Sequence, residues 1–134
     1  MVVDTSALIA IALGERSRSA LLDRIGAATV RLISSVSVLE AGIVLRARLG
    51  AKSDRLLNEL IEELALEIAA FDDIQARRAI AAFGQYGKGM GHRAPLNFGD
   101  CAVYALADLK GQPILAIGGV FSATDLVVLR PNHV

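Results

Sequence analysis

The order of apolar and polar positions predicts short strands that alternate with helices along the whole chain. The expected strands are short apolar segments, several of them rich in β-branched residues: Met1–Asp4, Val30–Ile33, Leu66–Phe71, Pro113–Ile117 and Leu126–Leu129. We expect Leu66–Phe71 to be buried and Leu126–Leu129 to lie at an edge. Nearly continuous apolar strands separated by helices are typical of a parallel sheet covered on both faces. We therefore predict an α/β fold with one domain, residues 1–134, in which helices flank a mostly parallel sheet of four or five strands.

The segments between these strands have helical periodicity and recognisable ends. The predicted helices are Thr5–Leu13, Ser17–Ala28, Ser37–Leu49, Ser53–Leu64, a helix that begins at Asp72 or Asp73 and reaches Tyr86, and one that begins at Asn97 or Asp100 and reaches Leu109. We expect Thr5 or Ser6 to cap the first helix and Ser53 the fourth. Gly50 and Gly111 are expected to end the third and the last. A glycine-rich break is expected at 84–91.

Composition narrows the class of protein. A chain of 134 residues with 54% hydrophobic residues is long enough for a real core and too apolar for a disordered regulator. No run reaches the roughly 18 uncharged apolar residues of a membrane span, and we expect neither a span nor a signal peptide. The single cysteine, Cys101, excludes a disulfide framework and a cysteine-rich zinc site, and is expected in the core. This usage favours the cytoplasm.

The charges are balanced but unevenly distributed. Fourteen acidic residues cancel fourteen Lys and Arg residues, which argues against a non-specific basic coat for nucleic acid. Residues 54–73 are strongly acidic, whereas 74–99 contain bases and no acid. Lys88 and Arg93 precede Asp100 and are candidates for contacts with RNA phosphates. Arg46 and Arg48 are further candidates, and His92 is more typical of a surface residue than of a general acid.

Three carboxylates occupy positions where a parallel sheet binds ligands, beyond the carboxyl ends of its strands. Asp4 directly follows the first strand, although it could simply cap the next helix. Glu40 lies among apolar neighbours without a nearby base, and it either seeks a cation or faces a solvent stripe. Asp100 falls in the first turn of a helix that Asn97 could cap. Oxygen ligands without His or Cys suit Mg²⁺ or Mn²⁺, and such a cluster is typical of metal-assisted phosphodiester hydrolysis.

These residues stand in segments that resemble the PIN-domain toxins of the VapC type. The resemblance rests on Met-Val-Val-Asp-Thr-Ser-Ala-Leu at the start, on 34–40 with its acid, and above all on Leu-Asn-Phe-Gly-Asp at 96–100 followed by Tyr-Ala-Leu. It implies a Mg²⁺-dependent endoribonuclease, Mn²⁺ being a possible substitute, that is usually dimeric and is inhibited by a VapB-type antitoxin. It also implies that Asp4, Glu40 and Asp100 are the metal-site acids. Ser6, Thr5 and Asn97 would then be supporting polar residues.

One turn departs from the family pattern. Members commonly carry an acidic pair after the penultimate strand, where this chain has Gly119 and Val120. Asp125 is the nearest remaining acid, and it could cap or orient the final turn instead. Our hypothesis is one divalent ion held by Asp4 and Asp100, with Glu40 helping directly or through water.

Two alternatives follow from the same residues. The missing acid favours a catalytically weakened PIN-like module that binds RNA or antitoxin without cutting. An aspartate-nucleophile phosphatase also begins with a strand and an Asp, but it would need a second acid where Ser6 stands.

The large apolar fraction also predicts an interface. We expect the helix at 56–64, with Ile43 and Leu45, to form a groove for a partner helix.

Overall fold

The computed structural model describes residues 1–90 and 95–131 and contains one sheet of five parallel strands. The strands are β1 (Val2–Val3), β2 (Leu32–Ser34), β3 (Glu67–Ala69), β4 (Ile114–Leu115) and β5 (Val128–Leu129). Their spatial order is β3-β2-β1-β4-β5, and every neighbouring pair is parallel. The predicted α/β class, the parallel sheet and the flanking helices are therefore confirmed. The three central strands bring their carboxyl ends to one edge of the molecule.

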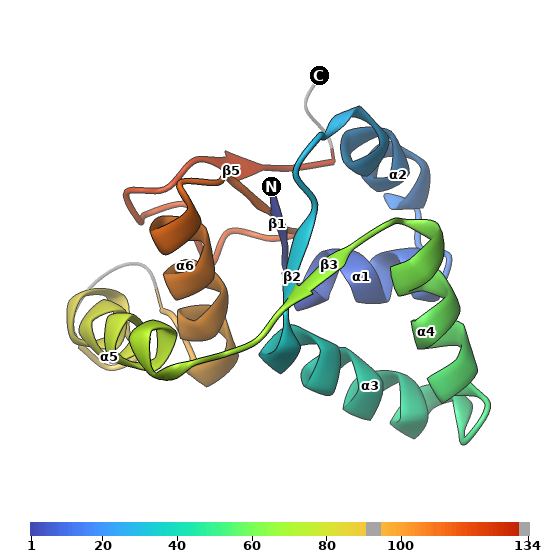
Figure 1. Ribbon diagram of the computed structural model, residues 1–134, viewed down its shortest axis with the longest axis horizontal. Helices are drawn as coiled ribbons and strands as arrows, with labels where there is room; N and C mark the ends of the chain where they lie inside the picture. Colours follow the sequence, from blue (N-terminus) through green and yellow to red (C-terminus); the bar gives the residue numbers. More distant parts are fainter. Residues whose placement is uncertain (91–94, 132–134) are drawn as a thin grey trace.

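Helices cover both faces of this sheet (Figure 1). They are α1 (Thr5–Ala12), α2 (Arg18–Ala27), α3 (Ser35–Leu49), α4 (Ser53–Glu63), α5 (Asp73–Tyr86) and α6 (Phe98–Lys110). The first four lie on one side, whereas α5 and α6 pack together on the other. In the described part of the chain, no helix is long and apolar enough to cross a membrane.

Strand side chains alternate between two hydrophobic cores, as the pleat of a strand requires. Val3 and Ile33 belong to the core beneath α1, α3 and α4, whereas Val2 and Leu32 belong to the core beneath α5 and α6. The whole central strand is thus buried on both faces. Asp4, the next residue, directly follows this strand at the carboxyl edge of the sheet.

Side chains cap four of the six described helices at their N-termini, and two caps differ from expectation. Asp4, rather than Thr5 or Ser6, caps α1, and Ser53 is the first residue of α4 instead of its cap. Gly50 and Gly111 end α3 and α6 as predicted. Gly84 does not break α5, because the buried side chains of Ala82 and Tyr86 on either side of it keep this turn packed.

Two surfaces also differ from the predicted pattern. Strand β3 is an edge strand with Glu67 and Ile68 exposed, so its expected burial was wrong. Helix α3 buries the stripe Ser37, Ala41 and Leu45, which lets it pack closely on α1 and α4. As a result Leu39 and Ile43, two apolar positions of the same helix, are 63% and 61% exposed.

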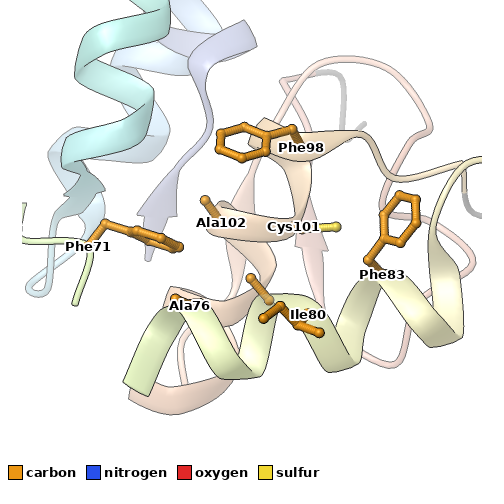
Figure 2. Close-up of a pocket in the computed structure, with 8 residues that line it drawn as sticks. Phe71, Ala76, Ile80, Phe83, Phe98, Cys101 and Ala102 are labelled. Carbon is orange, nitrogen blue, oxygen red and sulfur yellow. The ribbon is translucent and has the colours of Figure 1, made fainter. Parts of the chain in front are cut away.

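Of the residues expected to line a groove beside α4, Leu45, Leu57 and Leu60 are buried in the core, whereas Ile43 is exposed. An apolar groove of about 370 Å³ lies instead between α5 and α6 (Figure 2). Its lining residues are Phe71, Ala76, Ala79, Ile80, Phe83, Phe98, Cys101 and Ala102. Phe98 stands at its rim and is 82% exposed.

Candidate active site

The three predicted acids come from three different elements. Asp4 follows β1 and caps α1, Glu40 lies in α3, which begins directly after β2, and Asp100 lies in the first turn of α6. Because β1 and β2 are parallel neighbours, their carboxyl ends open onto the same edge of the sheet. Helix α6 packs against β1, β2 and α3, and so carries the third acid to the same place.

Asp4 is held by Ser6 and is only 7% exposed. The amide and the hydroxyl of Ser6 both donate to Asp4 Oδ2, at 3.1 and 2.6 Å. The Ser6 hydroxyl oxygen in turn accepts the amide of Ile117 at 3.1 Å. Burial raises the pKa of Asp4, and these hydrogen bonds oppose that rise. The helix-cap interpretation of Asp4 is therefore correct.

Glu40 is half-buried and is positioned by a threonine and a glycine. The Thr5 hydroxyl donates to Glu40 Oε1 at 3.0 Å. The Glu40 carboxylate also lies against Gly99, in the space that a Cβ at residue 99 would occupy. Any larger residue at 99 would have to displace this carboxylate. Gly99 is therefore a site residue that sequence reasoning missed; its place directly before Asp100 was the only signal.

Asp100 is fixed by a reciprocal cap with Asn97. The Asp100 amide donates to Asn97 Oδ1 at 2.9 Å, and the Asn97 amide donates to Asp100 Oδ2 at 3.0 Å. Partial burial, together with the negative charges of Asp4 and Glu40, raises the pKa of Asp100 to about 6. The second of these causes shows that the three carboxylates share one electrostatic environment.

Within residues 1–90 and 95–131, none of the four salt bridges involves Asp4, Glu40 or Asp100. In the same residues, no group of three His, Cys, Asp or Glu side chains is arranged to hold one metal ion. Mg²⁺ is usually bound by one or two carboxylates and several waters, so it does not need such a group. The chemistry of the donors therefore fits a hydrated Mg²⁺ between two acids, with the third acid nearby.

The remaining predicted residues are placed as follows. Gly119 and Val120 lie in the segment after β4. The first residues of this segment lie next to Ser6. Asp125 accepts hydrogen bonds from the hydroxyls of Tyr86 and Tyr104. Lys88 is exposed, and Arg93 and His92 lie outside the described residues. Cys101 is buried as expected, and burial raises the pKa of its thiol to about 11.

The raised pKa of Asp100 predicts how acidity affects the stability of the metal-free protein. The folded state favours the protonated carboxyl, so its contribution to stability is full below pH 4 and is lost as the pH rises toward 6. Asp100→Asn keeps an acceptor for the Asn97 amide and removes the charge. We expect it to raise the free energy of unfolding at pH 7 in EDTA by about 1–2 kcal/mol, after allowance for partial exposure, and to change it little at pH 3.5. Denaturant titrations at both pH values measure this difference, with exposed Asp23→Asn as the matched control. Equal stability of wild type and Asp100→Asn at pH 7 would contradict it.

Comparison with known proteins places this arrangement in a family. The family model described as PIN domain matches residues 1–125. The chain is 45% identical to Ribonuclease VapC28 of Mycobacterium tuberculosis, over 94% of this chain and 95% of the relative. It is 41% identical to a Ribonuclease VapC of Mycolicibacterium smegmatis, over 97% and 100%.

Solved structures agree on the fold. The crystal structure of Mycobacterium tuberculosis VapC20, a toxin described as cleaving the sarcin-ricin loop, superposes with a TM-score of 0.77 at 21% identity, covering 97% of this chain and 98% of that one. FitAcB from Neisseria gonorrhoeae gives a TM-score of 0.74 at 21% identity, covering 99% of each chain. With acids at the positions that the resemblance implied and relatives of matching length, this chain belongs to the PIN-domain family and, within it, to the VapC type.

Proposed function

We propose that this chain is the toxin of a VapBC toxin–antitoxin module and acts as a metal-dependent endoribonuclease. The observation that carries the proposal is the convergence of buried Asp4 with Asp100 and Glu40 at the carboxyl edge of the sheet, without a described cation to balance them. Relatives of equal length that are named ribonucleases support RNA as the substrate. The single cysteine, buried and unpaired, supports a cytoplasmic location.

Mg²⁺ is the cofactor that these donors favour, with Mn²⁺ as a substitute. Asp4 and Asp100 would hold the ion, and Glu40 would act directly or through water. When bound, a divalent ion activates water and neutralises charge that develops on the phosphate. The chain's own part is to hold its carboxylates still: Ser6 fixes Asp4, Thr5 fixes Glu40 and Asn97 fixes Asp100. Lys88 and Arg93 would contact RNA phosphates.

The partners follow from exposed apolar surface and from neighbouring structures. A structure titled as a VapBC2 complex from Rickettsia felis shares the fold, with a TM-score of 0.76, and supports a VapB-type antitoxin that inhibits this chain. For the groove between α5 and α6 we propose a second copy of this chain. The exposed Phe98 side chain lies beside the groove, on the same surface patch. In a dimer with a two-fold axis, Phe98 of each copy can insert into the groove of the other.

A second candidate function is a PIN-like module that binds RNA or antitoxin without cutting. It is favoured by Gly119 and Val120, which supply no carboxylate where the family commonly has acids. The two candidates differ in one outcome, namely whether wild-type protein cleaves RNA in the presence of Mg²⁺ or Mn²⁺.

Removal of the Asp4 charge should abolish cleavage. We expect Asp4→Asn to lower the rate of cleavage of a structured RNA by about two orders of magnitude, because the buried ligand oxygen loses its charge. The comparison is with wild type and Asp23→Asn in the same Mg²⁺ buffer. Equal rates in wild type and Asp4→Asn would indicate a contaminating nuclease, and an inactive wild type would favour the binding module.

An acid restored at residue 119 should strengthen metal binding. Gly119 has no positive φ, and a Cβ there would meet Ser122 Oγ at an ordinary contact distance of 3.6 Å. We therefore expect Gly119→Asp to fold normally and to raise Mg²⁺ affinity in calorimetry by about tenfold, an added charged ligand being worth on the order of 1.4 kcal/mol. Val120→Asp is the neighbouring variant, and Gly119→Asn is the uncharged control. Unchanged Mg²⁺ affinity in both acidic variants would contradict this prediction.

Dimer formation should depend on Phe98. Because its side chain is 82% exposed, Phe98→Asp removes an apolar contact without opening a cavity in the fold. We expect light scattering after gel filtration to give the mass of two chains for wild type and of one chain for Phe98→Asp. Val127→Asp, at another exposed apolar position, serves as the control. A monomeric wild type, or a dimer that survives Phe98→Asp, would exclude this interface.

A further inference from the structure

The segment that connects β4 to β5 is attached to the acid site at its first residues. The Asp4 amide donates to the carbonyl of Leu115 at 2.9 Å. Two residues later, the Ile117 amide donates to Ser6 Oγ, and the same hydroxyl donates to Asp4 Oδ2. The backbone at 115–117 and the Asp4 carboxylate are therefore joined through one serine.

The far end of the same segment is attached to α6. Asp125 Oδ1 accepts the hydroxyl of Tyr104 at 2.6 Å and that of Tyr86 at 3.3 Å. Between the two attachments, Phe121 is buried in the core under α5 and α6. The segment thus has a fixed start, a fixed middle and a fixed end, although it contains neither helix nor strand.

Tyr104 connects this attachment to the second acid. It lies four residues after Asp100 in α6, which is about one helical turn, and it is 1% exposed. The Arg78 guanidinium lies 5.5 Å from the centre of its ring and pairs with Asp108 one turn further along α6. The Tyr104 ring therefore has little freedom to move, and the position of its hydroxyl reports the position of α6.

We propose that residues 117–125 act as a strut that sets the separation between Asp4 and Asp100, with Asp125 as its positioning residue. One end of the strut fixes Asp4 through Ser6, and the other fixes the helix that carries Asp100 through Tyr104. The proposal deepens the nuclease function proposed above, where these two acids hold the metal. It also gives Asp125 a role, as an acceptor of tyrosine hydroxyls in place of a metal ligand.

The charges around Asp125 agree with this role. The hydroxyl of Tyr104 lowers the pKa of Asp125, and burial together with this carboxylate raises the pKa of Tyr104. A hydroxyl bonded to an ionised carboxylate makes a stronger hydrogen bond than one between two neutral groups. Such a bond suits a fixed attachment.

The test uses the full chain and four variants. Asp125→Ala and Tyr104→Phe each break the attachment, Asp125→Asn keeps an acceptor for the tyrosines, and Glu59→Gln is a control that breaks an exposed ion pair with Arg55 in α4, on the other side of the sheet. The first readout is hydrogen exchange of the Ile117 amide in metal-free protein, measured by NMR. The second is the rate of RNA cleavage at saturating RNA. Since the sequence has two tyrosines and no tryptophan, tyrosine fluorescence reports whether the two Asp125 variants, which retain both tyrosines, keep the attachment.

We expect Ile117 exchange to be about tenfold faster in Asp125→Ala and Tyr104→Phe, with cleavage slowed by a similar factor, and both to return toward wild type in Asp125→Asn. Unchanged Ile117 exchange in both disrupting variants would overturn the strut, as would an equal effect of Glu59→Gln. If Asp125→Ala does not fold, Ile117 exchange in Tyr104→Phe and in Asp125→Asn decides whether the strut exists. A wild type that cleaves no RNA would contradict the proposed function, and Ile117 exchange would still decide the strut.

Discussion

The structure is organised around like charges that are forced together at the carboxyl edge of a sheet buried on both faces. Asp4 is held at this edge, because Val2 and Val3 before it are buried in the two cores. Asp100 and Glu40 arrive beside it from helices packed on those cores, and burial and mutual repulsion raise the pKa of Asp100. A site of this kind costs folding stability in the absence of a cation. Binding of a divalent cation would relieve this cost.

Neutral hydrogen-bond donors and helix ends hold these acids in place. Asp4 is the cap of α1, and Asp100 is part of the reciprocal cap of α6, so both lie where partial positive charge of a helix favours a carboxylate. Ser6 and Thr5 add hydroxyl donors without adding a counter-ion. Lysine or arginine in these roles would neutralise the acids and compete with a metal. The zero net charge of the chain therefore says little about its site, whose local charge is negative.

Strand and helix positions could be predicted from the sequence because they follow from local periodicity and caps. Asp4 could be singled out because it follows a strand, Glu40 because its helix neighbours are apolar, and Asp100 because it lies in the first turn of a helix. The buried face of α3 could not be predicted in this way. Val36, Leu39 and Ile43 have the apolar spacing of a buried stripe, yet close packing on two helices selects the small residues Ser37 and Ala41. The burial of β3 was wrong for a related reason, since an edge position is a property of strand order. Gly99 and Asp125 act through partners distant in sequence, which periodicity does not reveal.

Asp4 and Asp125 show that the surroundings of a carboxylate, and not its place after a strand, decide what it can do. The Asp4 backbone is hydrogen-bonded to the end of β4, and Asp125 lies in the segment that follows β4. Each carboxylate accepts a short hydrogen bond of 2.6 Å. Asp125 faces two tyrosine hydroxyls and a nearby arginine, which lower its pKa and satisfy its charge. Asp4 has one serine, deep burial and acidic neighbours, which leave its charge poorly compensated. An acid with satisfied partners is suited to hold structure in place, whereas an acid without a counter-ion is suited to bind one. Counting acids along the chain cannot separate the two, because the difference lies in the donors that the fold brings to each.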